Sequence, residues 1–485
     1  MGTLEGNLAM NTAAFTTQQR ELERLLQVQK AAHLAAGPLS AETRIAWLDR
    51  LIGLMVDRQD DIIAAANEDF GNRSGVATLL ADVFAVIGSL KFARENLRDW
   101  MRPESFEAAF PDAVARVEYQ PLGVVGILSP WNFPFNLTFA PLAGVVAAGN
   151  RAIIKPSEFT PACSELLRDM IAGAFDESEI AVVTGDAGVA AHFATLPFDH
   201  ILFTGSTSVA KHVARAAAEN LVPLTLELGG KSPVIVSESA PIADAAARVM
   251  TIKTLNAGQI CLAPDYVMLP EGKVEEFSTA AASAVAAMFP TLKDNPDYTS
   301  IINQRHYDRL RSYIDDARVK GARIVEINPA GEDFSQQEAR RLPPTLVIDA
   351  PDDAKIMQDE IFGPLLPVRT YRAVEEAIAY VNARPRPLAL YFFGQDEAEE
   401  RLVLDRTTSG GVTVNDVMSH AFAENMPFGG VGGSGSGAYH GKAGFLAFSH
   451  AKSIYRQSKA PEAEYFLRPP YGDAIRQFLA SAISR

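Results

Sequence analysis

The feature that most constrains the fold of this chain is a repeated alternation of short apolar runs with helical segments. The runs AVVTG (181–185) and HILFTG (200–205) each end in glycine, and each precedes a segment with helical character. A second alternation begins after Gly230 and includes predicted helices over 240–256 and 271–289. Strands that alternate with helices imply a parallel, doubly wound sheet. The sequence therefore predicts an α/β fold with two doubly wound domains.

The length and composition exclude several classes of protein. The 485 residues exceed what one hydrophobic core organises, so two or three domains are expected. The net charge of -15, with no Lys/Arg cluster, argues against nucleic acid and anionic membranes as partners. The two cysteines, Cys163 and Cys261, are too few for a disulfide framework, which favours a reducing compartment. The 8 histidines show no pairing at ligand spacing, so no metal site is predicted.

No targeting or membrane segment is evident. The N-terminus lacks a basic segment followed by an apolar run, so no secretory signal is predicted. The most apolar window, 135–149, is shorter than the roughly 20 residues of a membrane helix and contains Asn136. Helical segments over 17–35, 41–66 and 76–100 precede it and are expected to form a helical layer. We expect a cytoplasmic protein that does not enter a membrane.

Two side chains suited to covalent chemistry on a carbonyl stand in the stretch 224–267. Glu227 ends an apolar run in LTLELGGKSP, and Cys261 lies in a polar bend in NAGQICLAPDYV. A cysteine supplies a nucleophile, and a carboxylate activates it or the water that releases the product. Taken singly, the cysteine also fits a small buried hydrophobe, and the glutamate also fits a solvated strand end. The assignment of the pair therefore depends on the sequence words around it.

Polar residues near two other predicted strands form candidate binding positions. Asn132, in SPWNFPFNL, is an amide between bulky residues and is suited to donate to a developing oxyanion, although a turn residue fits the same pattern. Lys155 and Glu158, in IIKPSEFTP, could hold the hydroxyls of a ribose, although a solvated loop is the simpler interpretation. Thr160 is expected to cap a helix that begins at Pro161 and contains Cys163, which we interpret as structural.

A phosphate-binding turn is predicted at residues 203–206, where an apolar strand ends and a helix begins. A helix N-terminus offers free N–H groups and a positive dipole to a pyrophosphate, although an ordinary strand–turn–helix junction has the same pattern. The glycines of 430–435 match G-x-G-x-x-G by spelling alone. They lack a strand–helix context and an acidic residue at the right distance, so they predict no nucleotide site.

Five short sequence motifs, here called words, occur in the right order and decide between these interpretations. PWNFP, KPSE, LELGGKSP, GQIC and EIFGP together resemble the aldehyde dehydrogenase superfamily, and the resemblance covers nearly the whole chain. It implies that Cys261 is the nucleophile, Glu227 the general base and Asn132 the oxyanion donor. It implies NAD as the cofactor, with NADP accepted by some relatives, and an aldehyde as the substrate. The positions implied for cofactor binding are Trp131, Lys155, Glu158, Gly185, Phe203, Thr204, Gly205, Ser206, Val209, Leu228, Gly229, Glu360 and Phe362.

Further words narrow the branch of the superfamily. CLAPDYV (261–267) and the stretch PFGGVG…GAYHGKAGF resemble the class-3 branch, which oxidises fatty and aromatic aldehydes. DFGNRS (69–74) and WMRPE (100–104) resemble bacterial coniferyl aldehyde dehydrogenases. The chain departs from the class-3 pattern at GGSGSG, which lacks a methionine between the last glycines, and in the variable loop 419–425. Both departures fall near the expected substrate mouth and leave the identity of the aldehyde open.

The resemblance also implies an organisation in three regions. An NAD-binding domain spans 1–108 and 124–229, and a catalytic domain spans 230–428. An oligomerisation arm combines 109–123 with 440–460 and is expected to form a homodimer. In the implied reaction the Cys261 thiolate adds to the aldehyde, hydride is lost to the nicotinamide, and Glu227 activates the water that hydrolyses the thioester.

Two other classes of function remain open. A cofactor-free cysteine thioesterase could use Cys261 and Glu227, but it would not need Lys155, Glu158 or Glu360. A binding protein that kept the fold and lost the chemistry is disfavoured because the catalytic set, including Asn132, is present. The formation of NADH with a panel of aldehydes distinguishes these classes from a dehydrogenase.

Overall fold

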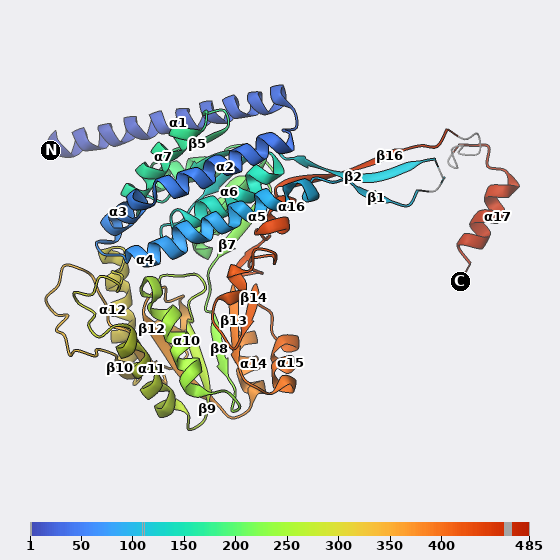
Figure 1. Ribbon diagram of the computed structural model, residues 1–485. Coiled ribbons are helices and arrows are strands. Elements are labelled where there is room, and N and C mark those ends of the chain that lie inside the picture. The colour runs from blue at the N-terminus through green and yellow to red at the C-terminus, as the bar shows by residue number, and fades with distance from the viewer. Residues whose placement is uncertain (1, 109, 111, 460–467, 485) are drawn as a thin grey trace.

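The computed structural model describes residues 2–108, 110, 112–459 and 468–484, with side chains described from Thr17 onward. Three sheets organise these residues into two α/β bodies and a projecting arm (Figure 1). The first body is the upper, blue-to-green part of the figure, and the second is the lower, yellow-to-orange part. The predicted α/β class with two doubly wound sheets is confirmed.

The first body contains a six-stranded sheet that is parallel except at one edge. Its apolar strands are buried, as expected for a sheet with both faces covered by helices. Residue Leu128 pairs with both Lys155 and Phe203, and Glu227 pairs with Thr204, so these strands end in nearly the same row. The strands in sheet order are β15 (Gly435–Ser436, antiparallel), β7 (Leu224–Leu228), β6 (His200–Gly205), β3 (Val124–Leu128), β4 (Arg151–Lys155) and β5 (Ile180–Val182).

Helices cover both faces of this sheet. One face shares a hydrophobic core with the N-terminal helical layer, and the other face packs against α1, α8 and α9. The helices of the first face are α2 (Ala41–Asp57), α3 (Gln59–Phe70), α4 (Gly75–Thr78), the π-helical turn η1 (Leu79–Phe84), α5 (Ala85–Trp100), α6 (Asn136–Ala148) and α7 (Pro161–Ala174). Those of the second face are α1 (Gly2–Ala36), α8 (Ala187–Ala194) and α9 (Thr207–Ala218).

The second body contains a seven-stranded sheet between two further helical layers. Its strands in order are β10 (Arg323–Glu326, antiparallel), β11 (Thr345–Ile348), β12 (Leu365–Tyr371), β9 (Tyr266–Pro270), β8 (Pro233–Val236), β13 (Ala389–Phe393) and β14 (Gly411–Val414). Its helices are α10 (Ile242–Thr254), η2 (Leu255–Gly258), α11 (Val274–Met288), α12 (Gln304–Val319), α13 (Lys355–Gln358), α14 (Val374–Asn382) and α15 (Glu397–Arg406).

The arm is a three-stranded antiparallel sheet that projects away from both bodies (Figure 1). It is built from β1 (Glu104–Phe106), β2 (Val114–Pro121) and β16 (Ser449–Arg456), so two segments far apart in the sequence meet there. Strand β1 belongs to this sheet although it precedes residue 109. The C-terminal region also contains η3 (Ser419–Phe422), α16 (Gly441–Ala447) and α17 (Asp473–Ala482). The division into three functional regions stays a prediction, and residues 109, 111 and 460 lie outside the described residues.

Two helical predictions differ from the structure. The helix expected over 41–66 is divided at Arg58, whose backbone leaves the helical region at φ -112°, and α3 then continues to Phe70. The helix expected over 76–100 is one continuous segment, but η1 inserts a π turn in which the Ala85 N–H bonds to the Leu80 carbonyl. A π turn is invisible to a 3.6-residue periodicity and often marks a functional position.

The expected N-cap position of α7 is confirmed, because Thr160 directly precedes Pro161 at the first helical position. The Thr160 side chain makes no capping bond, however, and its hydroxyl has no hydrogen-bond partner in the described part of the chain. The Asp69 carboxylate instead accepts from the N–H groups of Ala162 and Cys163, at 3.0 and 2.8 Å. A carboxylate at a helix N-terminus also interacts favourably with the helix dipole. The cap is therefore supplied by α3, 93 residues earlier in the chain, which local sequence cannot reveal.

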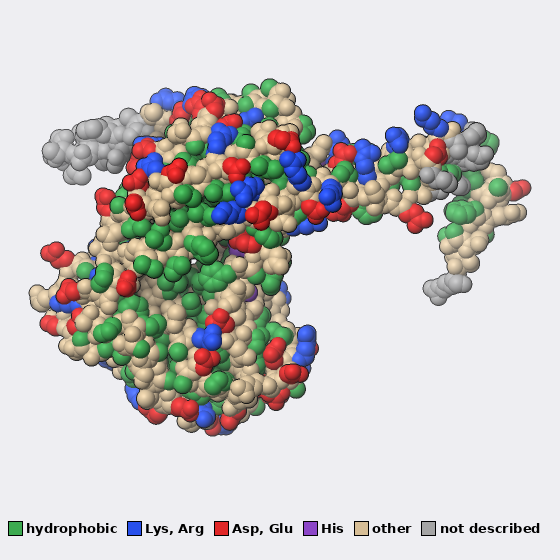
Figure 2. Space-filling model, viewed as in Figure 1, with side chains coloured by type: hydrophobic (Ala, Val, Ile, Leu, Met, Phe, Trp, Pro, Cys, Tyr) green, Lys and Arg blue, Asp and Glu red, His purple; other side chains and the backbone are tan. Residues whose placement is uncertain are grey.

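One described segment, Gly75–Trp100, is long and apolar enough by composition to span a membrane. One side of this segment packs in the first core through Val86, Leu90 and Leu97. Its other side leaves Leu80 and Phe84 exposed, which explains its high hydropathy. Figure 2 shows hydrophobic side chains gathered on this face, where the two bodies meet. The segment is therefore a core helix with an additional exposed apolar stripe.

The cap of α7 yields a test of stability. Replacing Asp69 with Ala removes two charge-assisted hydrogen bonds and should lower stability by about 1 kcal/mol, the usual cost of losing an N-cap. Asp69→Asn keeps an accepting oxygen and should lose less. Thermal unfolding of the purified protein is the measurement. Thr160→Val is the matched control. A larger loss of stability in that variant than in Asp69→Ala would show that the Thr160 side chain, and not Asp69, stabilises the start of α7.

Candidate active site

The candidate residues gather at one edge of the first sheet. Because β3, β4, β6 and β7 are parallel neighbours, their carboxyl ends meet at this edge. Ligands bind outside the carboxyl ends of strands in doubly wound sheets. The residues that follow these strands are Trp131 and Asn132 after β3, Lys155 and Glu158 at β4, Phe203–Ser206 at β6, and Glu227–Gly229 at β7.

Asn132 is buried in the loop between β3 and α6. Its side-chain amide donates to the Gln259 carbonyl at 3.2 Å, two residues before Cys261. An amide nitrogen carries two hydrogens, so this bond leaves one N–H available to a ligand. The structure thereby brings Asn132 to the loop that carries Cys261, from the other body. This arrangement can donate a hydrogen bond to an oxyanion formed at the cysteine.

Glu227 lies within β7 and is 3% exposed. Neither carboxylate oxygen has a hydrogen-bond partner among the described residues. Burial raises the pKa of the Glu227 carboxyl well above its usual range, because an ionised carboxylate is poorly solvated there. A buried, unpaired acid of this kind costs stability and is typical of functional sites.

Cys261 follows η2 in a half-buried bend beside the core of the second body. Burial, and then the charges of Glu360 and Glu227, raise the pKa of its thiol to about 12. The N–H groups of Cys261 and Leu262 oppose this shift and therefore face the sulfur. The thiol is protonated at neutral pH in this state and needs a proton acceptor before it can act as a nucleophile.

The β4 and β6 ends fit the adenosine half of a dinucleotide. Lys155 is buried at the end of its strand, and its ammonium donates to the exposed Glu158 carboxylate at 3.0 Å. Such a pair offers a donor and an acceptor to the two hydroxyls of a ribose. Ser206 caps α9 by accepting from the Val209 N–H at 3.4 Å, so the phosphate-type helix N-terminus predicted there is present. Gly185 is left-handed with φ 157° and stands just before α8.

The segment that carries Glu360 and Phe362 closes the other side of the site. A Cβ at Gly229 would lie 2.0 Å from Glu360 Oε1, so only a glycine allows this carboxylate to approach β7. Burial raises the pKa of Glu360 to about 8, with a further contribution from Asp265. Phe362 has a positive φ of 49° and packs edge-on against Trp131, with ring centroids 5.2 Å apart. The residues expected to hold the nicotinamide half therefore lie together.

Lys231 and Asp265 form an ion pair at the site that the sequence reasoning missed. Their side chains form a short ion pair, and Lys231 also donates to the carbonyls of Ile356 and Asp359 at 2.7 and 2.9 Å. Asp265 accepts from the Ile361 N–H at 2.9 Å. The pair therefore holds the segment on both sides of Glu360. Both residues stand inside the words LELGGKSP and CLAPDYV, and charged residues buried within such words are the signal that could have found them.

The glycine-rich stretch packs on β7 rather than on a phosphate. Gly435 pairs with Glu227, and the Leu228 N–H donates to the Ser434 carbonyl at 3.0 Å. A Cβ at Gly429 would lie 3.1 Å from Glu227 Oε1, and one at Gly435 would lie 2.1 Å from the Leu226 carbonyl oxygen. The glycines are thus needed for close backbone approach, which agrees with the rejection of a nucleotide fingerprint there.

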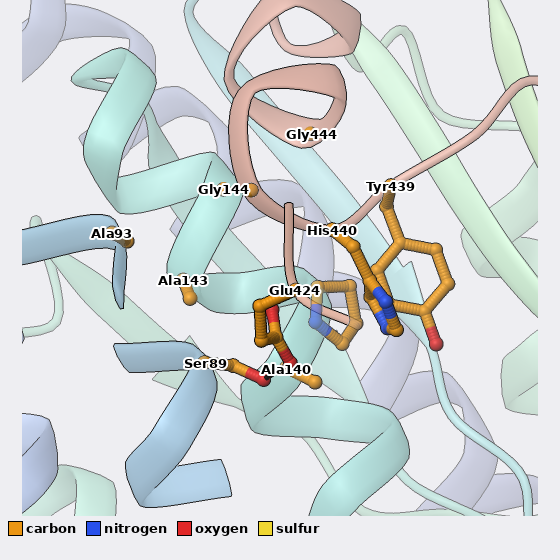
Figure 3. A pocket seen from close by; sticks show the side chains of 11 residues that line it. Ser89, Ala93, Ala140, Ala143, Gly144, Glu424, Tyr439, His440 and Gly444 are labelled. Carbon is orange, nitrogen blue, oxygen red and sulfur yellow. Dashed lines mark hydrogen bonds between the residues drawn. The ribbon is translucent and has the colours of Figure 1, made fainter. Parts of the chain in front are cut away.

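A small polar cavity lies behind this stretch, between α5, α6 and α16 (Figure 3). Ser89 donates a short hydrogen bond to the Glu424 carboxylate, and the two side chains point toward each other in the figure. His440 also lines it, and His440 Nδ1 has no hydrogen-bond partner among the described residues. Burial lowers the pKa of His440 to about 4 and raises that of Glu424. Tyr439 also lines the cavity, and its pKa is raised by burial and then by the charges of Glu227, Cys261 and Glu424.

Within residues 17–108, 110, 112–459 and 468–484, no group of three His, Cys, Asp or Glu side chains is placed to hold a metal ion. Cys163 is buried in α7, and burial raises the pKa of its thiol. Lys253 is also buried, its ammonium has no hydrogen-bond partner in the described part of the chain, and burial lowers its pKa to about 8. The charges of Asp265 and Glu360 oppose that shift, so Lys253 lies on the inner side of the site.

Comparison with known proteins identifies a family and close relatives. The model of the aldehyde dehydrogenase family matches residues 9–454. A Caulobacter vibrioides protein described as a probable coniferyl aldehyde dehydrogenase is 62% identical over 467 residues, which cover 95% of this chain and 96% of the relative. The coniferyl aldehyde dehydrogenase of a Pseudomonas species is 55% identical over 477 residues, which cover 98% and 99%.

Solved structures of similar proteins share the whole fold. The substrate-bound Staphylococcus aureus AldH has a TM-score of 0.89 and 36% identity, covering 95% of this chain and 99% of its own. The indole-3-acetaldehyde dehydrogenase of P. syringae, solved with NAD+, has a TM-score of 0.83 and 25% identity, covering 90% and 89%. The two bodies and their connection therefore recur in proteins of known structure.

The raised pKa of Glu227 predicts how stability depends on pH. The native state keeps the Glu227 proton above the ordinary carboxyl pKa of about 4.3, so the unfolding free energy falls as pH rises toward the native pKa. Glu227→Gln is neutral at every pH and escapes this loss. The melting temperature of the variant minus that of the parent should therefore increase from pH 5 to pH 9. Glu326→Gln, at an exposed position on β10, is the control. A difference that stays constant with pH would mean that Glu227 titrates normally.

Proposed function

Because the chain belongs to the aldehyde dehydrogenase family, and is an NAD-dependent enzyme that oxidises aldehydes to carboxylic acids, we propose that Cys261, Glu227 and Asn132 perform this reaction. The observation that carries the proposal is the convergence of three buried segments. The Asn132 amide donates to the loop that carries Cys261, and the charge of Glu227 contributes to the raised pKa of the Cys261 thiol.

In the first half of the proposed reaction, Cys261 Sγ bonds to the aldehyde carbon. The oxyanion is held by the second N–H of the Asn132 amide and by the Cys261 backbone N–H, which already faces the sulfur. The thiol proton must leave before this step, and Glu227 can accept it, since neither of its oxygens is engaged by the described residues. When bound, NAD would supply the acceptor for the hydride lost from the aldehyde carbon. Lys155, Glu158, Glu360 and Phe362 would hold it at the sheet edge.

In the second half, water hydrolyses the thioester on Cys261. Glu227 accepts a proton from this water as the water attacks the acyl carbon. The Asn132 amide again holds the oxyanion, and collapse returns the thiol and releases the acid. Glu227 must be ionised for this role, and because its pKa is raised, the rate of this half should increase with pH above the ordinary carboxyl range.

We propose an aromatic aldehyde of the coniferyl type as the substrate. The 62% and 55% identical relatives bear that name, and their alignments cover nearly the whole of this chain. The exposed apolar side chains Leu80, Phe84, Phe422 and Met426 would suit the entry of an aromatic or medium-chain aldehyde.

We further propose a homodimer in the cytoplasm. The support for the dimer is the arm, a sheet whose strand β16 is an edge with exposed Tyr455 and whose strand β1 exposes Phe106. An exposed edge strand with aromatic side chains is suited to pairing with another chain. Sedimentation of the protein gives its mass in solution directly.

The two proposed roles of Glu227 are separated by its replacement with Gln. Loss of a positioned base costs about 10²–10⁴-fold in the step it serves. If Glu227 mainly activates water, mixing Glu227→Gln with NAD and aldehyde should give one NADH per site and then almost none. Intact mass should reveal an acyl group on the protein that is absent from Cys261→Ala. Steady turnover near the parental rate would remove Glu227 from the reaction, and a slow phase without an acyl group would assign it to the thiol alone.

The substrate proposal is tested with matched aldehydes. We expect kcat/KM to be higher for coniferyl aldehyde than for cinnamaldehyde, which lacks the ring oxygens, and lowest for acetaldehyde. Acetaldehyde as the best substrate would contradict the substrate class.

A further inference from the structure

We propose that the buried ion pair of Arg73 and Asp82 is a positioning clamp for the loop that carries Asn132. The proposal rests on the role of Asn132 proposed above and concerns two residues that touch neither the aldehyde nor the reacting atoms. Arg73 belongs to the word DFGNRS, which the proposed chemistry otherwise leaves without a role. Asp82 lies on the π turn η1.

The Arg73 guanidinium fixes the first end of the loop. The residue is 3% exposed, and one terminal nitrogen donates to the Asn132 carbonyl at 2.9 Å. The other donates to Asp82 Oδ2 at 2.6 Å. The guanidinium also lies over the rings of Phe70 and Phe133, at 4.8 and 5.0 Å from their centroids. A planar fork that is bonded at both tips and lies over two aromatic rings has one orientation, which a lysine could not reproduce.

The Asp82 carboxylate fixes the second end of the same loop. The residue is fully buried, and Oδ1 accepts from the backbone N–H groups of Phe135 and Asn136 at 3.2 and 2.9 Å. Asn136 in turn donates its side-chain amide to the Ala81 carbonyl on η1. The ion pair therefore links the carbonyl of Asn132 with the N–H groups three and four residues later, and the loop between them has little freedom.

The hydrogen bonds of the clamp continue into the loop that carries Cys261. The Asn132 carbonyl also accepts from the Asn256 side chain at 3.2 Å, and Asn256 has a left-handed backbone at φ 48°. Asn256 donates a second bond to the Gln259 carbonyl at 3.3 Å, the same atom that receives the Asn132 amide. Arg73 and Asn256 thus hold Asn132 from opposite bodies. A displacement of the Asn132 backbone would carry its amide away from the Cys261 loop.

The rest of the word DFGNRS is bonded to the same surroundings. Asn72 donates to the Tyr298 carbonyl at 2.9 Å, and Ser74 donates to the Asp297 carboxylate at 2.7 Å. That segment leads to Ser300, whose carbonyl accepts from the Gln259 side chain at 3.1 Å. Stability alone does not account for such a buried pair, because an apolar pair of similar volume is often equally stable. Its directional bonds to the loop of Asn132 supply the other reason for it.

The test removes both charges together, so that neither is left buried and unpaired. In the double variant Arg73→Met/Asp82→Asn we expect the melting temperature and the affinity for NAD to stay close to those of the parent. We expect kcat to fall about 10- to 100-fold, less than or equal to the loss of one oxyanion donor. Arg94→Met/Asp49→Asn removes an Arg–Asp pair of 2.8 Å on the outside of the same helical layer and is the matched control. A parental kcat in the first double variant would overturn the clamp.

A double-mutant cycle with Asn132→Ala shows whether the pair acts through Asn132. If it does, removing the pair should cost less than about threefold once the amide is absent, because the two losses describe the same interaction. Independent, multiplicative losses would show a general structural role and overturn the clamp. Arg73→Lys keeps the charge balance if the double variant fails to fold, and it should show the same dependence on Asn132. A parental rate in Asn132→Ala itself would instead overturn the proposed oxyanion role, and the clamp with it.

Discussion

The structure depends on the rule that neighbouring parallel strands end at the same edge. Strands β7, β6, β3 and β4 are adjacent and almost in register, so residues far apart in sequence are delivered to one line. Such strands need helical crossovers, which bury both faces of the sheet and leave only the edge for polar groups. The second body then contributes the loop that carries the Cys261 thiol and the segment that carries the Glu360 carboxylate.

This arrangement has a cost in stability, because several ionisable groups are buried without full pairing. The carboxyls of Glu227 and Glu360 have raised pKa values, the thiol of Cys261 has one of about 12, and the ammonium of Lys253 has one of about 8. Burial is the first cause in each case, and it favours the neutral form. The acids and the thiol among these groups destabilise the apoprotein at high pH, whereas Lys253, whose pKa is lowered, destabilises it as the pH falls.

Much of the fold and site could be predicted from the sequence, for identifiable reasons. The strand–helix alternation fixes a doubly wound class, and residues such as Lys155 and Glu227 stand next to predicted strand ends, where such folds place ligands. The side chain that makes the capping bonds of α7 could not be predicted. Asp69 reaches the helix from 93 residues away, and Thr160 offers the same chemistry locally. The π turn, the left-handed Asn256 and the pairing of Lys231 with Asp265 are likewise set by tertiary contacts. The roles of individual site residues remain predictions until they are tested.

The two kinds of sequence word have different physical tasks. The superfamily words carry groups that can meet the reacting atoms, and their glycines allow backbone to approach those groups, as Gly229 does beside Glu360. The word DFGNRS carries groups that bond to the backbone behind them: Asp69 caps α7, Asn72 and Ser74 hold the 297–298 turn, and Arg73 holds Asn132. Chemistry of this kind tolerates different supports, provided that the amide stays within hydrogen-bond reach of the oxyanion. A branch of the family can therefore differ in its supports while it retains the reaction.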